Sequence, residues 1–571
     1  MRGAEVLVKM LINYDVKKVF GVPGAQTLPI YEAIYDHQDQ ISHLLFREET
    51  NAVFAADAYA KVTSKVGVAD ATLGPGALRA VPAVAESYNS SIPLILFIGN
   101  NPISWIPLTV YRGNASQAVD QVRVFEPITK WVGQLTSIKS IPSAIRFAFR
   151  VATSGRPGPV VIDVPYNILL DEIEIKDSDL YAQREFSRVP ALRIAPSPEK
   201  ISEAVKLIQE SERPLIIAGG GIFLSNALNE LYSLAVTFNI PVVATINGKG
   251  AFPETHPLYL GVLGNLGGWV TAEKAAKRAD LLIFIGSNAD QITTMDWSIP
   301  LENQKIIHID VDPIELCRNF ACNVAIAGDA QVSLNALFSK LSNVGCNPKT
   351  GWVEEILKLK KEILDPLEYV GYIESERLDP KKVMKIIDEF FANKKNVIFV
   401  SDASSASGWV AGYIKTKESG RRFLFPRGMA GLGYAIPACI GATIGAKDLD
   451  KGLYVESRCV AIAGDGGAAY SIIELETARR YDIPLITIIL NDSALGWIKK
   501  IQEKSGKVYS SEFIEVNFAS VSKGLKGQGY EVRSYEDLRW ALERCFNENV
   551  PCTIDVKVET MVPYKPLTSY S

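Results

Sequence analysis

The stretch Val460–Asp492, VAIAGDGGAAYSIIELETARRYDIPLITIILND, contains the pattern that decides the fold of this chain. The apolar run Val460–Ala463 predicts a strand, and the glycines after it predict a tight turn. Tyr470–Tyr481 then predicts a helix, and Pro484–Leu490 predicts a second strand. This order of strand, helix and strand is typical of a parallel sheet in an α/β protein.

Two carboxylates stand at the ends of these predicted strands. Asp465 follows the first strand and Asp492 follows the second. Because parallel strands end at the same edge of a sheet, both side chains can converge on one hard cation. Gly464, Gly466 and Gly467 let the backbone approach a ligand closely, and the helix that follows directs free N–H groups at it. These features suit a diphosphate held through Mg²⁺.

The arrangement resembles the thiamine-diphosphate motif, in which a GDG sequence precedes a paired Asn-Asn after one helix and one strand. The resemblance implies that Asp465, Asp492 and the carbonyl of Ala494 hold the metal. Asp492 replaces the usual second Asn, and a carboxylate is still a good Mg²⁺ ligand. The implied cofactors are thiamine diphosphate and Mg²⁺.

A second segment, Phe46–Ala52 (FREETNA), resembles the R-H-E-Q-x-A segment of the acetolactate synthase group, with Glu48 in place of the His. The resemblance makes Glu49 the catalytic glutamate, a buried carboxyl with a raised pKa that hydrogen-bonds the aminopyrimidine ring and drives cofactor activation. The alternative is that Arg47, Glu48 and Glu49 form only a charged helix start. The metal motif in the same chain favours the catalytic role.

The resemblance to this family extends over nearly the whole chain. Arg422–Pro437 (RFLFPRGMAGLGYAIP) is similar to the segment that grips the pyrimidine. By position, the Ala430 carbonyl and the Leu432 N–H would bind the ring. The Leu432 side chain would hold the cofactor bent, and Ser405 is assigned to the cofactor site as well.

The first part of the chain combines features of two groups. Val19–Ile34 resembles acetolactate synthase, with Ala25 and Gln26 in place of Gly-Ala. Asn114–Trp131 looks closer to benzaldehyde lyase. Within it, Gln117 is positioned to hydrogen-bond the developing hydroxyl of the intermediate, the alternative being a surface-loop amide.

In the last part of the chain, the Trp that narrows the synthase pocket is replaced by Ile501, and Trp497 lies beside the metal loop. The loss of aromatic volume predicts a pocket that admits acceptors bulkier than pyruvate. The predicted substrate residues are Ala25, Gln26, Gln117, Leu432, Trp497 and Ile501.

Strand and helix signals alternate in three segments separated by polar stretches. They predict an α/β fold with three doubly wound parallel sheets: a pyrimidine-binding domain at 1–175, a central Rossmann-like domain at 197–345 and a diphosphate- and Mg²⁺-binding domain at 380–571. Glu49 and Asp465 fall in different domains, and in the resembled family a second subunit completes the site. We therefore expect a homodimer, or a homotetramer built as a dimer of dimers.

The sequence of the central segment does not decide whether it binds a nucleotide. Its Gly219–Gly221 turn and the strand end Asp310–Asp312 could hold FAD or ADP, although glycine after a strand is also an ordinary tight turn. Acetolactate synthases usually carry Arg in a G-A-R-F-D segment, whereas this chain has Gly286–Asp290 (GSNAD). FAD therefore stays open as a second cofactor.

Composition is that of a large globular enzyme. The chain has 571 residues, of which 47% are hydrophobic and 22% charged, so it can bury several cores. A net charge of −4 provides no basic field for nucleic acid. No apolar run reaches membrane-spanning length, and without a signal-peptide block the expected location is cytoplasmic. The seven scattered cysteines include no CxxC, which argues against disulfides and zinc.

These observations predict a thiamine-diphosphate enzyme that makes or breaks C–C bonds beside a carbonyl. The favoured reaction is acetolactate-type carboligation, in which a 2-oxo acid such as pyruvate loses CO₂ and the remaining unit adds to a second carbonyl. A benzaldehyde-lyase-like acyloin lyase comes second, and a 2-oxo acid decarboxylase or oxidase third. A non-catalytic paralogue is disfavoured by the intact Glu49 and metal motif, and a small regulatory subunit stays open as a partner.

Overall fold

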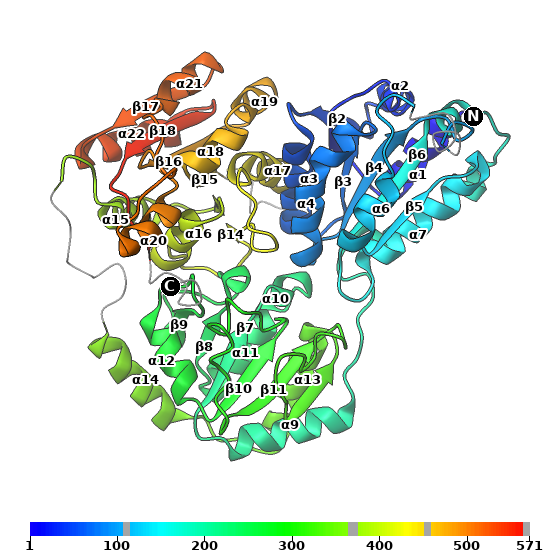
Figure 1. The fold of residues 1–571 in the computed structure, drawn as a ribbon. Coiled ribbons are helices and arrows are strands. Elements are labelled where there is room, and N and C mark those ends of the chain that lie inside the picture. Colours follow the sequence, from blue (N-terminus) through cyan, green and yellow to red (C-terminus); the bar gives the residue numbers. More distant parts are fainter. Residues whose placement is uncertain (107–114, 364–374, 450–457, 564–571) are drawn as a thin grey trace.

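The computed structural model describes residues 1–106, 115–363, 375–449 and 458–563 (Figure 1). They form three six-stranded sheets whose paired strands all run parallel, which confirms the predicted α/β class. We call each sheet with its helices the first, central and third domain. The predicted limits 1–175, 197–345 and 380–571 stay predictions, and residues 564–571 lie outside the described part of the chain.

The first domain has the strand order β2-β1-β3-β4-β6-β5. Alternate strand residues face two cores, so Val68 packs on the α1 side of the sheet and Ala69 packs on the α3 side. The strands are β1 (Lys18–Gly21), β2 (Ser42–Leu45), β3 (Gly67–Ala71), β4 (Leu94–Asn100), β5 (Trp131–Gln134) and β6 (Pro159–Pro165). The helices are α1 (Gly3–Asn13), α2 (Leu28–Tyr35), α3 (Glu49–Thr63), α4 (Pro75–Asn89), α6 (Gln121–Phe125), α7 (Ile141–Thr153) and α8 (Tyr166–Leu170).

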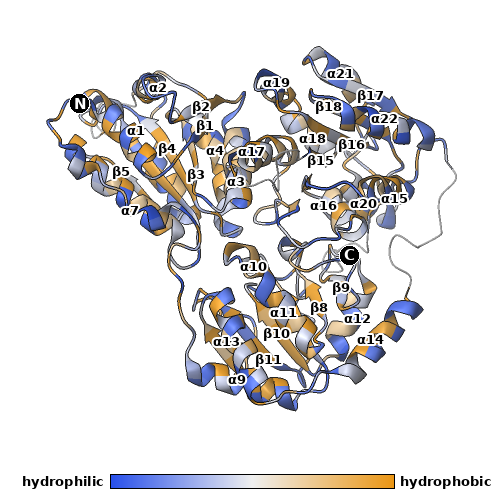
Figure 2. Cartoon of the chain, turned by 180° about the vertical axis from the view of Figure 1, so that it is seen from behind, coloured by the Kyte–Doolittle hydropathy of each residue, from blue (hydrophilic) through white to orange (hydrophobic). Residues whose placement is uncertain are grey.

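The central domain has the strand order β12-β11-β10-β7-β8-β9. Figure 2 shows that its strands are hydrophobic, while the outer faces of α9, α13 and α14 are hydrophilic. The strands are β7 (Pro214–Ala218), β8 (Val242–Ala244), β9 (Tyr259–Val262), β10 (Leu281–Ile285), β11 (Lys305–Asp310) and β12 (Val324–Ala327). The helices are α9 (Pro198–Glu210), α10 (Gly221–Leu224), α11 (Leu228–Phe238), α12 (Val270–Arg278), α13 (Ala330–Asn343) and α14 (Thr350–Glu362).

The prediction that the cysteines are unpaired is wrong for two of them. Cys317 and Cys322 form a disulfide, because the loop between β11 and β12 folds back and brings their Cα atoms to 5.6 Å. Four of the other five, Cys439, Cys459, Cys545 and Cys552, are buried in the core as small residues, and Cys346 is half-buried.

The third domain has the strand order β14-β13-β15-β16-β18-β17. The strands are β13 (Val397–Ser401), β14 (Phe423–Leu424), β15 (Arg458–Gly464), β16 (Leu485–Asn491), β17 (Gln528–Val532) and β18 (Cys552–Lys557). The helices are α15 (Pro380–Phe391), α16 (Ser405–Tyr413), α17 (Ala435–Asp448), α18 (Asp465–Ser471), α19 (Glu474–Arg480), α20 (Gly496–Ser505), α21 (Phe518–Gly524) and α22 (Tyr535–Asn547). None of the helices in the described ranges combines the length and apolar character needed to cross a bilayer.

The helix predicted at Tyr470–Tyr481 differs from the two helices observed. The helical stretch starts earlier, at Asp465, and is divided into α18 and α19. Asp465 stands in the first turn of α18, where the helix dipole favours a negative charge. The residue expected to bind metal therefore also begins the helix.

The first and third domains meet through α3 and α17 (Figure 1). The helices approach so closely that a Cβ on Gly441 would lie 1.9 Å from the Ala55 carbonyl oxygen. Buried polar groups complete the contact, since Asp57 pairs with Lys61 at 2.7 Å and accepts a hydrogen bond from the Tyr434 hydroxyl at 2.8 Å. This packing fixes the position of α3, and with it Glu49, relative to the third domain.

We expect Gly441→Ala to lower the free energy of unfolding by about 1–3 kcal/mol, because the added methyl meets backbone that cannot yield. Gly445→Ala on the same helix is the matched control, since its Cβ would first meet the Thr63 methyl at 3.1 Å. Its effect should stay within about 1 kcal/mol. Thermal and urea unfolding of both variants measure this, and equal stability would refute the close approach.

Candidate active site

Asp465 and Asp492 lie side by side at the ends of neighbouring strands. Asp465 directly follows β15, and Asp492 directly follows its partner β16. The two carboxyl groups interact directly, since burial and then the charge of Asp492 raise the pKa of Asp465. Burial also raises the pKa of Asp492. A divalent cation would replace the proton that these raised pKa values favour, with the Ala494 carbonyl as a candidate third ligand.

A cavity of about 430 Å³, which we call the carboxylate cavity, opens over this pair. Gly464 faces open space, where a Cβ would meet no atom within 4 Å, so the backbone can approach a ligand. The cavity gathers ten of the predicted residues: Ser405, Ala430, Leu432, Gly464, Asp465, Gly466, Gly467, Asp492, Ala494 and Trp497.

Asp402 holds together two backbone segments beside this cavity, the one after β13 and the one that contains Leu432. The sequence did not single it out. Its carboxylate accepts hydrogen bonds from the N–H groups of Ala403 at 2.8 Å, Gly433 at 3.1 Å and Ala435 at 3.1 Å. Its Oδ1 also lies 2.7 Å from where a Cβ of Gly467 would stand. Burial raises the pKa of Asp402 to about 6. The available sequence signal was a polar residue directly after the apolar strand β13.

The backbone around the carboxylate cavity adopts conformations that non-glycine residues rarely take. Ser404, Ala430 and Ser493 have φ angles of +62°, +56° and +56°. Such residues persist only where the surroundings hold them, and they concentrate at functional sites. All three flank residues that line the cavity or line it themselves.

Glu49 lies at the first position of α3, at the edge of the first sheet. It is 9% exposed, and burial raises its pKa. The preceding Glu48 caps the helix by accepting a hydrogen bond from the Asn51 N–H at 3.0 Å. A Cβ on Gly76 would lie 2.9 Å from Glu49 Oε1, so the Gly-Pro-Gly turn packs directly against the carboxyl group.

The other predicted first-domain residues surround the same turn. The Thr72 hydroxyl donates a hydrogen bond to Gln26 Oε1 at 3.1 Å. Gln117 has a φ of +61°, and its carbonyl oxygen would lie 2.1 Å from a Cβ on Gly74. We call the set Ala25, Gln26, Glu49 and Gln117 the first-domain half-site.

The first-domain half-site and the carboxylate cavity are separate within one chain. Among the described residues, the cavity is lined only by central- and third-domain side chains. The start of α3 packs instead on α19, where Asn51 Nδ2 donates to Glu474 at 3.0 Å. Ile501 lies one helical turn beyond Trp497 on α20 and does not line the cavity.

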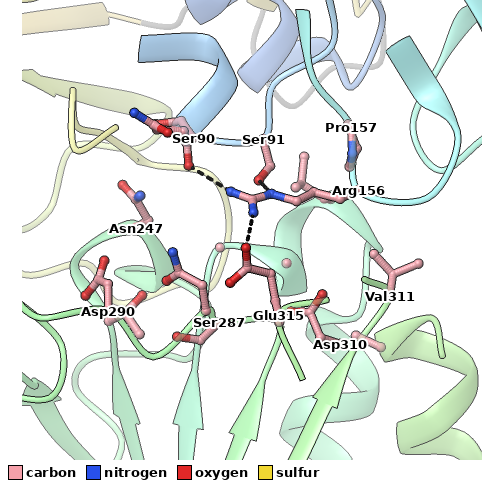
Figure 3. Close-up of a pocket in the computed structure, with 18 of the residues that line it drawn as sticks. Ser90, Ser91, Arg156, Pro157, Asn247, Ser287, Asp290, Asp310, Val311 and Glu315 are labelled. Atoms are coloured by element: carbon pink, nitrogen blue, oxygen red, sulfur yellow. Dashed lines mark hydrogen bonds and ion pairs between the residues drawn. The ribbon is translucent and has the colours of Figure 1, made fainter. Parts of the chain in front are cut away.

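A second cavity, of about 690 Å³, lies where the three domains meet (Figure 3). Its central-domain wall includes Gly220 and Asp310. They belong to the turn and the strand end that the sequence offered as a possible nucleotide site. Arg421 and Arg427 also line it, and neither guanidinium makes a hydrogen bond or an ion pair within the described ranges. Burial lowers the pKa of both, that of Arg421 to about 10. This interdomain cavity therefore suits an anion.

Comparisons with known proteins cover most of the chain. Thiamine pyrophosphate enzyme models match at 1–124 (N-terminal TPP binding domain), 201–337 (central domain) and 402–556 (C-terminal TPP binding domain). A probable acetolactate synthase large subunit of Methanocaldococcus jannaschii is 34% identical over 98% of this chain and 92% of its own length. The chain belongs to the thiamine pyrophosphate enzymes of the acetolactate synthase type. Acetolactate synthase large subunits of Cyanidium caldarium and Lactococcus lactis are 32% and 30% identical, over 98% and 100% of this chain and 93% and 95% of theirs.

Family membership confirms the predicted cofactor, thiamine diphosphate, and agrees with the geometry. The two TPP binding models cover the parts of the chain that contain the first-domain half-site and the aspartate pair. Arg427 is the residue that sequence reasoning should have weighed in this enzyme, because it lines both cavities and supplies a buried positive charge. It stands five residues before Leu432, within the segment already singled out.

Proposed function

We propose that this enzyme removes the carboxyl group of a 2-oxo acid such as pyruvate as CO₂ and joins the remaining unit to a second carbonyl compound, as an acetolactate synthase does. Bound thiamine diphosphate supplies the carbon nucleophile for this chemistry. The observation that carries the proposal is that Asp465, Asp492 and Arg427 line one cavity. Two carboxylates suit Mg²⁺ on a diphosphate, and one buried cation suits a substrate carboxylate.

The residues present fit the cofactor. Asp465 and Asp492 would hold Mg²⁺, the Leu432 turn would hold the pyrimidine, and Glu49 would hold a proton at the ring nitrogen, helped by its raised pKa. Gln26 and Gln117 would donate neutral hydrogen bonds to substrate oxygens.

A benzaldehyde-lyase-like acyloin lyase is the second candidate, supported by the segment around Gln117. Arg427 favours the first, because an acyloin without a carboxylate would leave that buried cation unpaired. Incubation with pyruvate, thiamine diphosphate and Mg²⁺, followed by product identification, decides among the reactions. Acetolactate supports the first, cleavage of an acyloin alone supports the second, and acetaldehyde alone indicates a decarboxylase.

We further propose that two copies of the chain complete each site, because the first-domain half-site and the carboxylate cavity do not meet in one chain. A homodimer would place Glu49 of one copy over Asp465 of the other, and a homotetramer would repeat this. A small regulatory subunit and the cytoplasmic location stay predictions.

The interdomain cavity is proposed to hold an anionic nucleotide, with FAD as one form. Support comes from Arg421 and Arg427, which form no ion pair in the described residues, and from the Gly219–Gly221 turn after β7. Titration with FAD and with ADP, followed by flavin fluorescence and calorimetry, tests it. Failure of both to bind would remove this proposal.

Replacing Glu49 by Gln should abolish nearly all turnover while leaving the fold and cofactor affinity largely intact, since only the ionisable group supports the proton shift. Glu48→Gln is the matched control, because an amide oxygen can still cap Asn51 N–H. Steady-state rates with pyruvate decide the matter. If the turnover of Glu49→Gln stayed within about threefold of the parent, Glu49 would not have the catalytic role assigned to it.

Asp465→Ala should abolish Mg²⁺-dependent cofactor binding, whereas Asp492→Asn should preserve or improve it by removing one charge beside the diphosphate. In the parent, Mg²⁺ affinity should rise with pH over the range where Asp465 loses its proton, because the raised pKa of Asp465 lets a proton compete with the metal. In Asp492→Asn this dependence should flatten. Calorimetric titration across pH measures both effects, and unchanged binding by Asp465→Ala would refute the metal site.

Mixing two inactive variants tests the shared site. Co-expressed Glu49→Gln and Asp465→Ala chains should regain about a quarter of parental turnover, because half of the dimers are mixed and one of their two sites is intact. Each variant alone should stay inactive. No recovery in a mixture shown to contain mixed dimers would mean that each chain builds its own site.

A further inference from the structure

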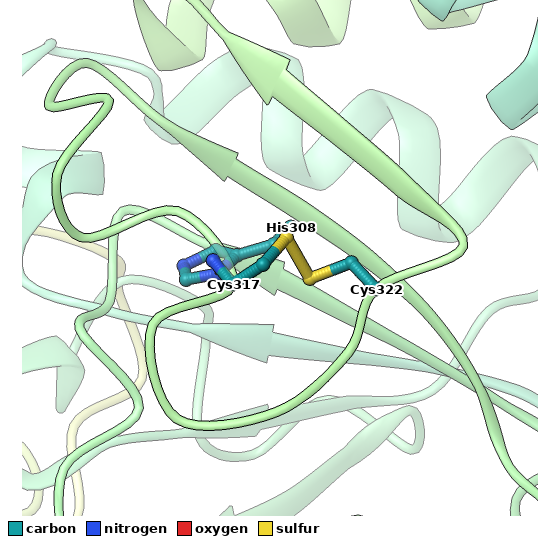
Figure 4. Close-up of side chains that lie close together, drawn as sticks. All are labelled: His308, Cys317 and Cys322. Carbon is teal, nitrogen blue, oxygen red and sulfur yellow. A yellow bond between two sulfur atoms is a disulfide. The ribbon is translucent and has the colours of Figure 1, made fainter.

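The loop from Val311 to Asn323 connects β11 to β12 and carries the Cys317–Cys322 disulfide (Figure 4). Both cysteines are half-buried, and Arg318, Asn319 and Asn323 beside them are exposed. A disulfide in this setting is open to attack by a thiolate from solvent, and the adjacent Arg318 favours the thiolate form of a released cysteine.

His308 lies next to the disulfide, but its ring is already engaged. Its Nε2–H donates to the Ser287 carbonyl at 2.7 Å, and its Nδ1 accepts from the Cys317 N–H at 3.1 Å. Burial lowers the pKa of His308, which keeps the imidazole neutral. His308, Cys317 and Cys322 have ligand-type atoms within 4.8 Å of one another, yet both ring nitrogens and both sulfurs are used without a metal. The cluster is therefore assigned to redox chemistry and not to metal binding.

The same loop holds a link between two domains. Glu315, which is 8% exposed, accepts hydrogen bonds at Oε1 from Arg156 at 2.7 Å and from Arg318 at 3.1 Å. Arg156 belongs to the first domain, where its Nε also donates to the Ser91 hydroxyl at 2.7 Å (Figure 3). The disulfide closes the ring that contains Arg318 and Asn319, and these two residues line the interdomain cavity with Glu315.

We propose that Cys317–Cys322 is a thiol–disulfide exchange site for a dithiol reductant, and that its redox state controls how firmly the 311–323 loop holds Arg156 of the first domain. One reductant thiolate attacks a sulfur of the pair and forms a mixed disulfide, and the second reductant thiol releases it. The pair gains two electrons and two protons as two thiols, and the reductant leaves as a disulfide. Without the cross-link the loop samples more conformations, so Glu315 spends less time on Arg156.

The test uses the full chain with dithiothreitol in its reduced or oxidised form. Alkylation of native protein followed by mass spectrometry reports whether Cys317 and Cys322 are paired. Hydrogen exchange reports two segments, 311–323 and the first-domain segment 151–158. Reduction should speed exchange in 311–323 by about tenfold and should also speed it in 151–158. Reoxidation should restore both.

Three variants isolate the cause. Cys346→Ser removes a half-buried, unpaired thiol elsewhere and should leave the redox response intact. Cys317→Ser with Cys322→Ser should show the fast exchange in either buffer. Glu315→Gln should keep the response in 311–323 but remove it in 151–158, since the charged link is gone.

Several outcomes would overturn the proposal. Alkylation of both cysteines without reductant would show that no disulfide forms. Equal exchange in 311–323 in the two redox states would show that the bond does not control the loop. Stoichiometric zinc on the reduced protein would assign the cluster to a metal instead. Product formation from pyruvate is independent of all three results, so this proposal and the proposed reaction can fail separately.

Discussion

The contact between α3 and α17 determines where the rest of the site can form. The backbone approach at Gly441 ties the first domain to the third, together with the Tyr434 hydroxyl, which donates to Asp57 and accepts from Lys61 on α3. This attachment holds the start of α3 against α19, so Glu49 stays away from the cavity lined by Asp465. Under the proposed shared site, a chain fixed in this way would present each half to another copy.

The electrostatics of the two cavities are incomplete without ligands. Asp402 is balanced by three backbone N–H groups, which makes it structural. Burial raises the pKa of Asp465 and of Asp492, and neither Arg421 nor Arg427 forms an ion pair within the described residues. Burial without compensation costs free energy, so such groups persist where a ligand supplies the opposite charge. This distribution of charge agrees with the proposed Mg²⁺ in the carboxylate cavity and the proposed anion in the interdomain cavity.

The features that the sequence predicted are local ones. The GDG turn, Asp492 and Glu49 each stand in a short segment whose strand or helix context can be read directly, so their positions at strand and helix ends follow. The cavity role of Asp402 depends on Gly433, about thirty residues away, and that of Arg427 depends on three domains meeting. Cys317 and Cys322 were missed because only a CxxC spacing was weighed, whereas a loop that folds back can pair cysteines five apart. The roles of Asp402, Arg427 and the cysteine pair depend on tertiary contacts, which composition and short motifs do not predict.

Arg427 gives the two cavities a common wall, which constrains how they can work together. An anion bound in the interdomain cavity beside Arg427 would partly neutralise it and weaken its attraction for a substrate carboxylate on the other side. Arg421 lines only the interdomain cavity and can take the anion instead. Under the two proposals, Arg421 would thus let Arg427 keep its charge for the carboxylate cavity. With Arg427 alone, a bound interdomain anion would weaken the binding of a substrate carboxylate, and the presence of both arginines would avoid that competition.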